Sequence, residues 1–152
     1  MKITVSQLLD KKGRNVWTIS PQASVYDALK LIADKDIGAL VVTDGGKILG
    51  MFSERDYARK VVLQGRWSKE TTVADVMTKQ VYFVPPWRTL DECMALMTYK
   101  RVRHLPVLES GRLVGVVSIG DVVKEIISEQ EFVIQELEGF VDEALKDKQR
   151  RS

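Results

Sequence analysis

Residues 21–59 read PQASVYDALKLIADKDIGALVVTDGGKILGMFSERDYAR, and residues 86–124 read PWRTLDECMALMTYKRVRHLPVLESGRLVGVVSIGDVVK. The second segment repeats the first without a gap, at a constant offset of 65 residues. Chance gives roughly two or three identities over such a length. The observed identities include Pro21/Pro86, Leu31/Leu96, Lys35/Lys100, Leu40/Leu105, Val42/Val107, Gly46/Gly111, Gly50/Gly115, Ser53/Ser118 and Asp56/Asp121. The chain is therefore a doubled unit, and any site built from the shared residues should occur twice, about a pseudo-two-fold axis.

Each copy predicts the element order β-α-β-β-α. A short extended piece, residues 16–19 or 81–84, ends at the prolines. A helix with capping-box spacing follows, at Ser24/Asp27 or Thr89/Glu92. Two strands come next, residues 37–43 and 47–52 in the first copy, joined by a glycine-containing tight turn. A last helix begins after Ser53 or Ser118, so we predict an α+β fold of two packed repeats.

Bulk composition excludes several protein classes. With 152 residues, 45% hydrophobic and 29% charged, the chain has the composition of a soluble globular protein, and we expect both copies to share one core. The opening residues MKITVSQLLD lack the apolar stretch of a signal peptide, which predicts a cytoplasmic protein without a membrane partner. One cysteine, Cys93, and one histidine are too few for a structural zinc site. A net charge of +2 predicts no broad field for nucleic acid.

The segments outside the repeats divide the chain into three predicted parts. These are a first repeat unit at residues 5–66, a second at residues 72–128 and a C-terminal helical tail at residues 129–152. A polar stretch joins the copies, a short helix over residues 72–77 leads into the second, and residues 5–9 match it at the start. The tail carries an apolar stripe at near-helical spacing: Val133, Leu137, Phe140, Val141, Ala144 and Leu145. Two interpretations stay open, packing on its own domain or a homodimer contact. The basic end, residues 146–151, is interpreted as solvated.

At this point the chain resembles a tandem pair of CBS domains, the cystathionine β-synthase type regulatory repeat, over residues 5–127. The motifs are IGALVV at 37–42 and VRHLPV at 102–107, each followed by a hairpin and by Gly-x-x-Ser-x-x-Asp. The resemblance implies a non-catalytic sensor of adenosine-containing ligands: AMP, ADP, ATP, NAD(H) or S-adenosylmethionine. It also implies a homodimer and a regulated protein partner, with no catalytic cofactor and no metal.

In CBS pairs each ligand cleft mixes the two repeats, and the resemblance implies two such clefts here. One would combine residues of both motifs: Ser53, Arg55, Asp56, Val81, Arg103, His104, Leu105 and Pro106. The other would use their counterparts: Ser118, Gly120, Asp121, Val16, Thr18, Ile37, Gly38 and Ala39. An aspartate can accept hydrogen bonds from both ribose hydroxyls, and a strand-end glycine lets a ligand approach the backbone. Phosphates would meet Arg55, Arg103 and His104, so the Asp56 cleft should prefer the more phosphorylated ligand.

Simpler interpretations stay open for these residues. Ser-x-x-Asp is also a capping box, Arg103 can be a solvent-facing strand residue, and a lone histidine is often structural. A nucleotide hydrolase using Asp56 and His104 is a second hypothesis, although the sequence has no P-loop and no Gly-x-Ser-x-Gly motif. A nucleic-acid-binding accessory protein, using the basic tail and residues 55–60, is a third, and the net charge argues against it.

Overall fold

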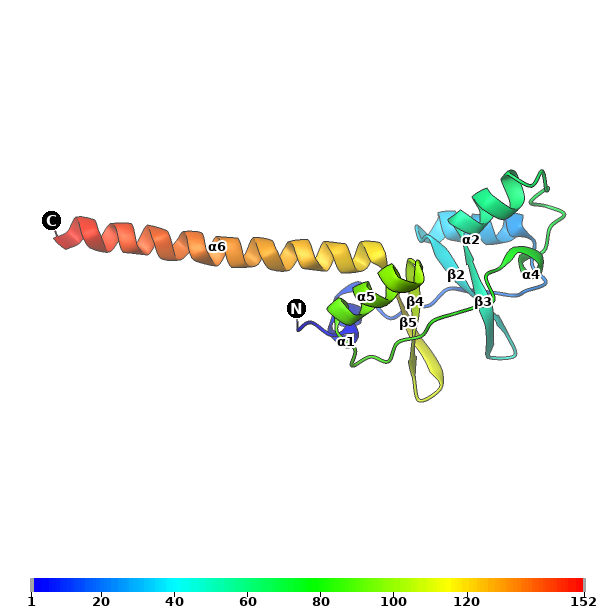
Figure 1. The fold of residues 1–152 in the computed structure, drawn as a ribbon, viewed down its shortest axis with the longest axis horizontal. Coiled ribbons are helices and arrows are strands. Elements are labelled where there is room, and N and C mark those ends of the chain that lie inside the picture. The colour runs from blue at the N-terminus through cyan, green and yellow to red at the C-terminus, as the bar shows by residue number, and fades with distance from the viewer. Residues whose placement is uncertain (1, 152) are drawn as a thin grey trace.

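The computed structural model describes residues 2–151, which form two similar α+β units and one long helix (Figure 1). The elements of the first half are α1 (Val5–Lys12), β1 (Thr18–Ile19), α2 (Val25–Lys35), β2 (Ala39–Asp44), β3 (Lys47–Ser53), α3 (Glu54–Asp56) and the π-helical segment η1 (Tyr57–Val62). Those of the second are α4 (Val73–Val76), α5 (Leu90–Lys100), β4 (His104–Glu109), β5 (Arg112–Ser118) and α6 (Ile119–Arg151). The predicted α+β class is confirmed.

The sheets follow the predicted hairpins. In the first unit β1 pairs in parallel with β2, which pairs antiparallel with β3, and in the second unit β4 pairs antiparallel with β5. The first turn has φ values of 57° at Gly45 and 78° at Gly46. The second has 52° at Ser110 and 76° at Gly111, so a serine adopts the left-handed conformation there. The predicted strand at residues 81–84 is reduced to a single parallel bridge between Val84 and Val107.

Strands β2 and β4 begin two residues later than the sequence pattern indicates. The helices before them end on left-handed residues, Asp36 at φ 53° and Arg101 at φ 55°. The next amide still closes the helix, because Ile37 N–H donates to Ile32 at 3.1 Å and Val102 N–H donates to Met97 at 3.0 Å. Residues 37 and 102 therefore serve the helix ends, and the strand pairing starts beyond them.

The core is divided in two, so the expectation of one shared core was wrong. Each unit buries its own cluster, with side chains from both its helices and its sheet. The short helices cross over between the units: Val5 and Leu9 of α1 are buried in the second unit's core, whereas Val73 and Val76 of α4 are buried in the first's. The core of the first unit is therefore completed by α4, which precedes the second repeat in the sequence. The core of the second unit is completed by α1, which precedes the first repeat.

The strand-end glycines allow these crossing segments to approach, not a ligand, which corrects the role expected for them. A Cβ on Gly50 would lie 2.5 Å from the carbonyl oxygen of Thr78, in the segment that follows α4. A Cβ on Gly115 would lie 2.7 Å from Cδ1 of Leu9 in α1. Both glycines are buried, and the chain itself occupies the space that a side chain would need.

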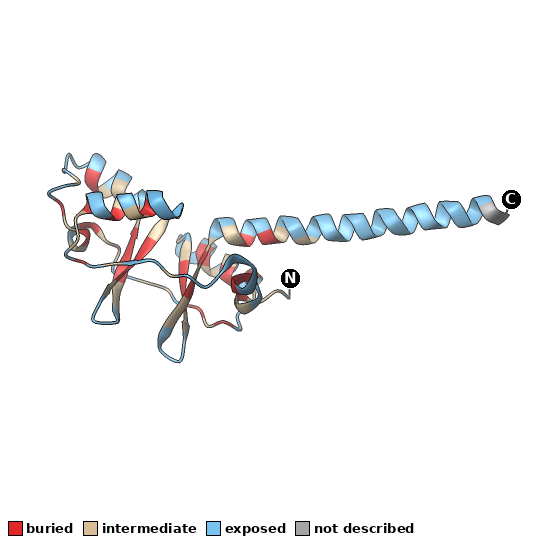
Figure 2. Ribbon diagram, turned by 180° about the vertical axis from the view of Figure 1, so that it is seen from behind, coloured by how far each residue is buried: buried red, intermediate tan, exposed pale blue. Residues whose placement is uncertain are grey.

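Helix α6 begins as the last helix of the second unit and then continues as a rod away from both units (Figures 1 and 2). Residues 130–149 are all exposed, so the apolar stripe does not pack on its own domain. Ser152, the last residue of the predicted tail, lies outside the described residues. Within residues 2–151, no helix has the length and hydropathy needed to cross a membrane.

The two glycines predict unequal effects of one substitution. Gly50→Ala should lower the free energy of unfolding by about 2–3 kcal/mol, because the added methyl meets a backbone carbonyl that can only move with its segment. Gly115→Ala should cost about 1 kcal/mol, because a leucine side chain can change its conformation. Urea unfolding of both variants checks this, and equal losses would contradict the backbone contact at Gly50.

Candidate functional site

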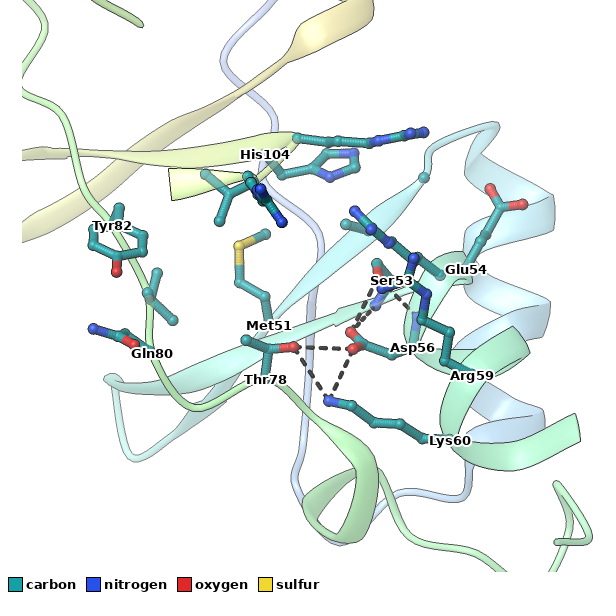
Figure 3. A pocket seen from close by; sticks show the side chains of 17 residues that line it. Met51, Ser53, Glu54, Asp56, Arg59, Lys60, Thr78, Gln80, Tyr82 and His104 are labelled. Atoms are coloured by element: carbon teal, nitrogen blue, oxygen red, sulfur yellow. Dashed lines mark hydrogen bonds and ion pairs between the residues drawn. The ribbon is translucent and has the colours of Figure 1, made fainter. Parts of the chain in front are cut away.

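A cavity of about 650 Å³ lies between the two units (Figure 3). That volume falls within the range of small-molecule sites. The first unit and the linker supply Gly38, Ala39, Met51, Ser53, Glu54, Arg55, Asp56, Arg59, Lys60, Thr78 and Gln80. The second repeat supplies Val81, Tyr82, Arg101, Val102, Arg103 and His104. Six of the eight residues predicted for the Asp56 cleft line this cavity: Ser53, Arg55, Asp56, Val81, Arg103 and His104.

Asp56 is the most highly connected side chain of the cavity, and only 8% of it is exposed. One carboxylate oxygen accepts hydrogen bonds from the amide of Ser53 at 2.9 Å and its hydroxyl at 3.0 Å. The other accepts from the hydroxyl of Thr78 at 2.9 Å and pairs with Nζ of Lys60 at 3.0 Å (Figure 3). A carboxylate offers about four lone-pair positions. Any further donor, such as a ribose hydroxyl, must therefore displace Thr78 or Lys60.

The capping interpretation of Ser-x-x-Asp is confirmed in both copies. The amide of Asp56 donates to the Ser53 hydroxyl at 3.1 Å, and the amide of Asp121 donates to the Ser118 hydroxyl at 3.1 Å. In return the amide of Ser118 donates to the Asp121 carboxylate at 2.9 Å. Capping fixes the direction of each aspartate, and a role in ribose binding stays a prediction.

Positive charge gathers around the cavity. Its cationic lining residues come from three different segments: Arg55, Arg59, Lys60, Arg101 and Arg103. The acidic lining residues are Glu54 and Asp56, and Asp56 is paired with Lys60. The surplus of guanidinium groups favours an anionic ligand, and their planar donors suit phosphate oxygens.

His104 lies where the second unit meets the first, with its ring against Gly38. A Cβ on Gly38 would lie 3.2 Å from Nε2 of His104, so the glycine makes room for the ring. Burial lowers the pKa of His104, and the positive charge of Lys12 lowers it further, against the opposing effect of Asp121. The imidazole is therefore neutral at pH 7 and can contribute a hydrogen bond to a ligand, but not the charge expected of a phosphate contact.

The counterpart carboxylate, Asp121, already has a cation beside it. Nζ of Lys12, in α1, lies 2.5 Å from the Asp121 carboxylate and also donates to the carbonyl of Val116 at 2.7 Å. Burial acts to raise the pKa of Asp121, but the hydrogen bonds from Lys12 and Ser118 and the charge of Lys12 hold it below its ordinary value. The neighbouring Lys11 pairs with the buried Glu125 at 2.6 Å. Two lysines of α1 thus pair with the two acidic residues in the first turns of α6, Asp121 and Glu125.

The other predicted residues lie elsewhere. Gly38 and Ala39, assigned to the Asp121 cleft, line the Asp56 cavity, because Ala39 pairs with Ser53 across the antiparallel strands β2 and β3. Leu105 and Pro106 are buried in β4 and do not line the cavity, and the Leu105 side chain belongs to the core of the second unit. The cavity also does not include the remaining residues of the second set: Val16, Thr18, Ile37, Ser118, Gly120 and Asp121.

Sequence reasoning missed several lining residues. Lys60 stands four residues after Asp56, a spacing that itself indicates an ion pair on one helix face. Tyr82 is the counterpart of Trp17 at the repeat offset, and both rings have a lysine over them, Lys100 at 5.5 Å and Lys35 at 4.2 Å. No sequence pattern indicated Thr78, because only the folded path of the linker brings its hydroxyl to Asp56.

The comparison with protein families agrees with this geometry. The model of the CBS domain matches twice, over residues 5–63 and 73–128. The chain belongs to the CBS domain family. Its two CBS domains correspond to the repeats found in the sequence, and α6 beyond residue 128 lies outside the match. Among the described residues, no group of three or more histidine, cysteine or acidic side chains is arranged to hold a metal ion.

Similar proteins carry the same CBS pair. The mitochondrial CBS domain-containing protein CBSX3 of Arabidopsis thaliana is 37% identical over 148 residues, covering 91% of this chain and 71% of that protein. A solved structure from Burkholderia ambifaria, named as a signal-transduction protein with CBS domains, is 55% identical and has a TM-score of 0.80. The match covers 84% of this chain and 96% of that chain. The CBS pair of MJ0100, solved with 5′-methylthioadenosine and S-adenosyl-L-methionine, has a TM-score of 0.75 at 22% identity. The match covers 85% of this chain and 99% of that chain, and it shows that the two share a fold.

The environment of His104 predicts a pH dependence of stability. Burial and Lys12 put the pKa of His104 in the folded state below its value in the unfolded chain, so protonation favours unfolding. Stability is unaffected above about pH 6.5 and decreases as the pH falls below it, by at most about 1.4 kcal/mol per pH unit. Urea unfolding at pH 7.5, 6.5 and 5.5 measures this decrease. His104→Gln should remove it, and an equal decrease in that variant would contradict the assignment to His104.

Proposed function

We propose that the chain is a non-catalytic regulatory module that binds an adenosine-containing ligand between its CBS domains and signals occupancy to a protein partner. One observation carries this proposal: the buried Asp56 carboxylate of one CBS domain faces a cavity whose opposite side, from the other CBS domain, is apolar and cationic. Those surfaces match the ribose, base and phosphates of a nucleotide. A ligand that spans both domains shifts their arrangement by its difference in affinity for the two states.

The ligand can be fitted to the cavity group by group. Its ribose hydroxyls donate to Asp56 and replace Lys60, whose ammonium is then free to meet a phosphate. Its base lies against Val81, Tyr82 and Val102, and the phosphates reach Arg55, Arg59 and Arg103. The ribose hydroxyls keep the Asp56 carboxylate hydrogen-bonded when Lys60 leaves it, and the Lys60 ammonium stays in the same cavity.

The ligand class is the adenosyl group, with phosphates preferred in the Asp56 cleft. AMP, ADP, ATP and NAD(H) all meet this description, and S-adenosylmethionine offers the same ribose and base. The fold accommodates adenosyl ligands in MJ0100. We propose that the Asp121 cleft binds more weakly, because Gly120 and Gly38 stand there in place of Arg55 and Arg103, so phosphates meet no guanidinium at these positions. A homodimer, a protein partner and a cytoplasmic location complete the proposal.

Asp56→Asn should weaken nucleotide binding by about 10- to 100-fold, because hydrogen bonds to a charged group contribute about 1.5–3 kcal/mol. Isothermal titration with AMP, ADP and ATP measures this. Asp121→Asn, the matched change in the other copy, should leave the tighter binding event unchanged. An unchanged affinity in the Asp56→Asn variant, with the fold intact by circular dichroism, would exclude Asp56 as the ribose contact.

Arg103→Ala should reduce the preference for phosphorylated ligands and leave adenosine binding unchanged, because the lost guanidinium meets only phosphate. A thermal-shift series with adenosine, AMP, ADP, ATP, NAD and S-adenosylmethionine measures both. A specific ligand at 100 times its Kd stabilises the wild-type chain by about 2.7 kcal/mol. No response to any ligand would overturn the sensor proposal, and release of product during the incubation would favour a hydrolase.

A further inference from the structure

The free part of α6 has an apolar face with no covering side chains from its own chain. Its members recur every three or four residues and so share one face: Val133, Ile134, Leu137, Phe140, Val141 and Ala144. Leu137 is 60% exposed and Phe140 is 68% exposed. The stripe continues in line with Ile126, which packs against the core of the second CBS domain.

A helix of this kind requires a partner. Isolated helices are marginal in water, and most helical stability in proteins comes from packing of the apolar face. Residues 130–149 are exposed, and Gly139 in their middle lowers the helix propensity further. This segment also lies beyond the family match at residue 128, so the CBS fold does not require it.

The charges along α6 are divided into two blocks. Between residues 125 and 145 the sequence has no lysine or arginine, and its acidic residues are Glu125, Glu129, Glu131, Glu136, Glu138, Asp142 and Glu143. The last turns are mainly basic, with Lys146, Lys148, Arg150 and Arg151 against one acidic residue, Asp147. Two such helices side by side in parallel would place acid against acid. In antiparallel order each basic end meets the partner's acidic block.

We propose that α6 pairs antiparallel with α6 of a second copy of this chain, with Leu137 of each opposite Phe140 of the other. In this register Val133 lies level with Ala144 of the second copy. Glu129 lies level with Lys148, and Glu131 with Lys146. The apolar faces cover each other along the helices, and the opposite charges meet at both ends of the contact.

A groove in the structure fits the end of the second helix. Where α6 leaves the CBS domain, a hollow is lined by Asp91, Ile126, Glu129, Gln130, Val133 and Ile134. In the proposed register, the basic last turns of the second copy lie at this level of the helix. The lining is apolar with two acidic residues, which complements the leucine and lysines of residues 145–148. In this proposal the α6 pairing is the contact that holds the two copies together, and it does not depend on nucleotide binding.

Two aspartate substitutions on opposite faces of the helix test the pairing. Leu137→Asp should lower the molar mass of the full chain, measured by light scattering after size exclusion, from that of the wild type to half of it. Phe132→Asp is the matched control, because Phe132 is 59% exposed and lies roughly 140° around the helix from Leu137. It should keep the wild-type mass. Equal masses for the wild type and both variants would overturn the proposal.

Cysteine cross-linking tests the direction. Cys93 is buried, and burial raises the pKa of its thiol to about 11, so it stays unreactive. Val133→Cys and Ala144→Cys chains should each stay uncrosslinked alone under mild oxidation. An equimolar mixture, re-equilibrated before oxidation, should give a disulfide-linked dimer. Cross-linking of each variant with itself, but not in the mixture, would show parallel pairing, and no cross-link in any sample would contradict the contact.

Discussion

The close approach of Thr78 to Gly50 is the constraint on which the site depends. Because Gly50 has no side chain, the segment after α4 lies directly on β3, where Met51 and Thr78 exchange hydrogen bonds of 2.9 and 2.8 Å. That position brings the Thr78 hydroxyl to the Asp56 carboxylate. It also directs the chain past the first CBS domain, so that Val81 and Tyr82 reach the cavity. The packing of the segment after α4 on β3 therefore places Thr78 beside Asp56 and Val81 and Tyr82 on the other side of the cavity.

The two equivalent aspartates, Asp56 and Asp121, are neutralised by lysines from different parts of the chain. Each aspartate is partly buried and has a lysine beside it, since an uncompensated carboxylate in such a place is costly. In the first CBS domain the lysine is Lys60, one turn along the same helix. In the second, the corresponding position is Glu125, and α1 supplies both Lys11 and Lys12. Each lysine also joins distant segments: Lys12 joins α1 to α6, and Lys60, which donates to the carbonyl of Val76 at 3.0 Å, joins η1 to α4.

Local rules in the sequence predicted most of the fold. The offset of 65, the capping residues Ser24 and Thr89, and the turn at Gly45 each act over a few residues, and the structure confirms them. The crossing of α1 and α4 was not predictable, because nothing in a short amphipathic helix specifies which of two similar units it completes. The same limit applies to the site. Asp56 was identified through the repeat and Arg103 through the resemblance to CBS pairs, but Thr78 and Lys12 reach their carboxylates through packing between distant segments.

Helix α6 joins Asp121, the counterpart of Asp56, to the far end of the molecule. Asp121 stands in its first turn, and the helix continues without a break to Arg151. At 1.5 Å per residue its 33 residues span about 50 Å. A rod of that length amplifies motion: a tilt of about 10° at its base moves its tip by about 9 Å. Because the base of the helix carries Asp121, a small tilt of this part of the second CBS domain becomes, at the tip, a displacement about as wide as a helix.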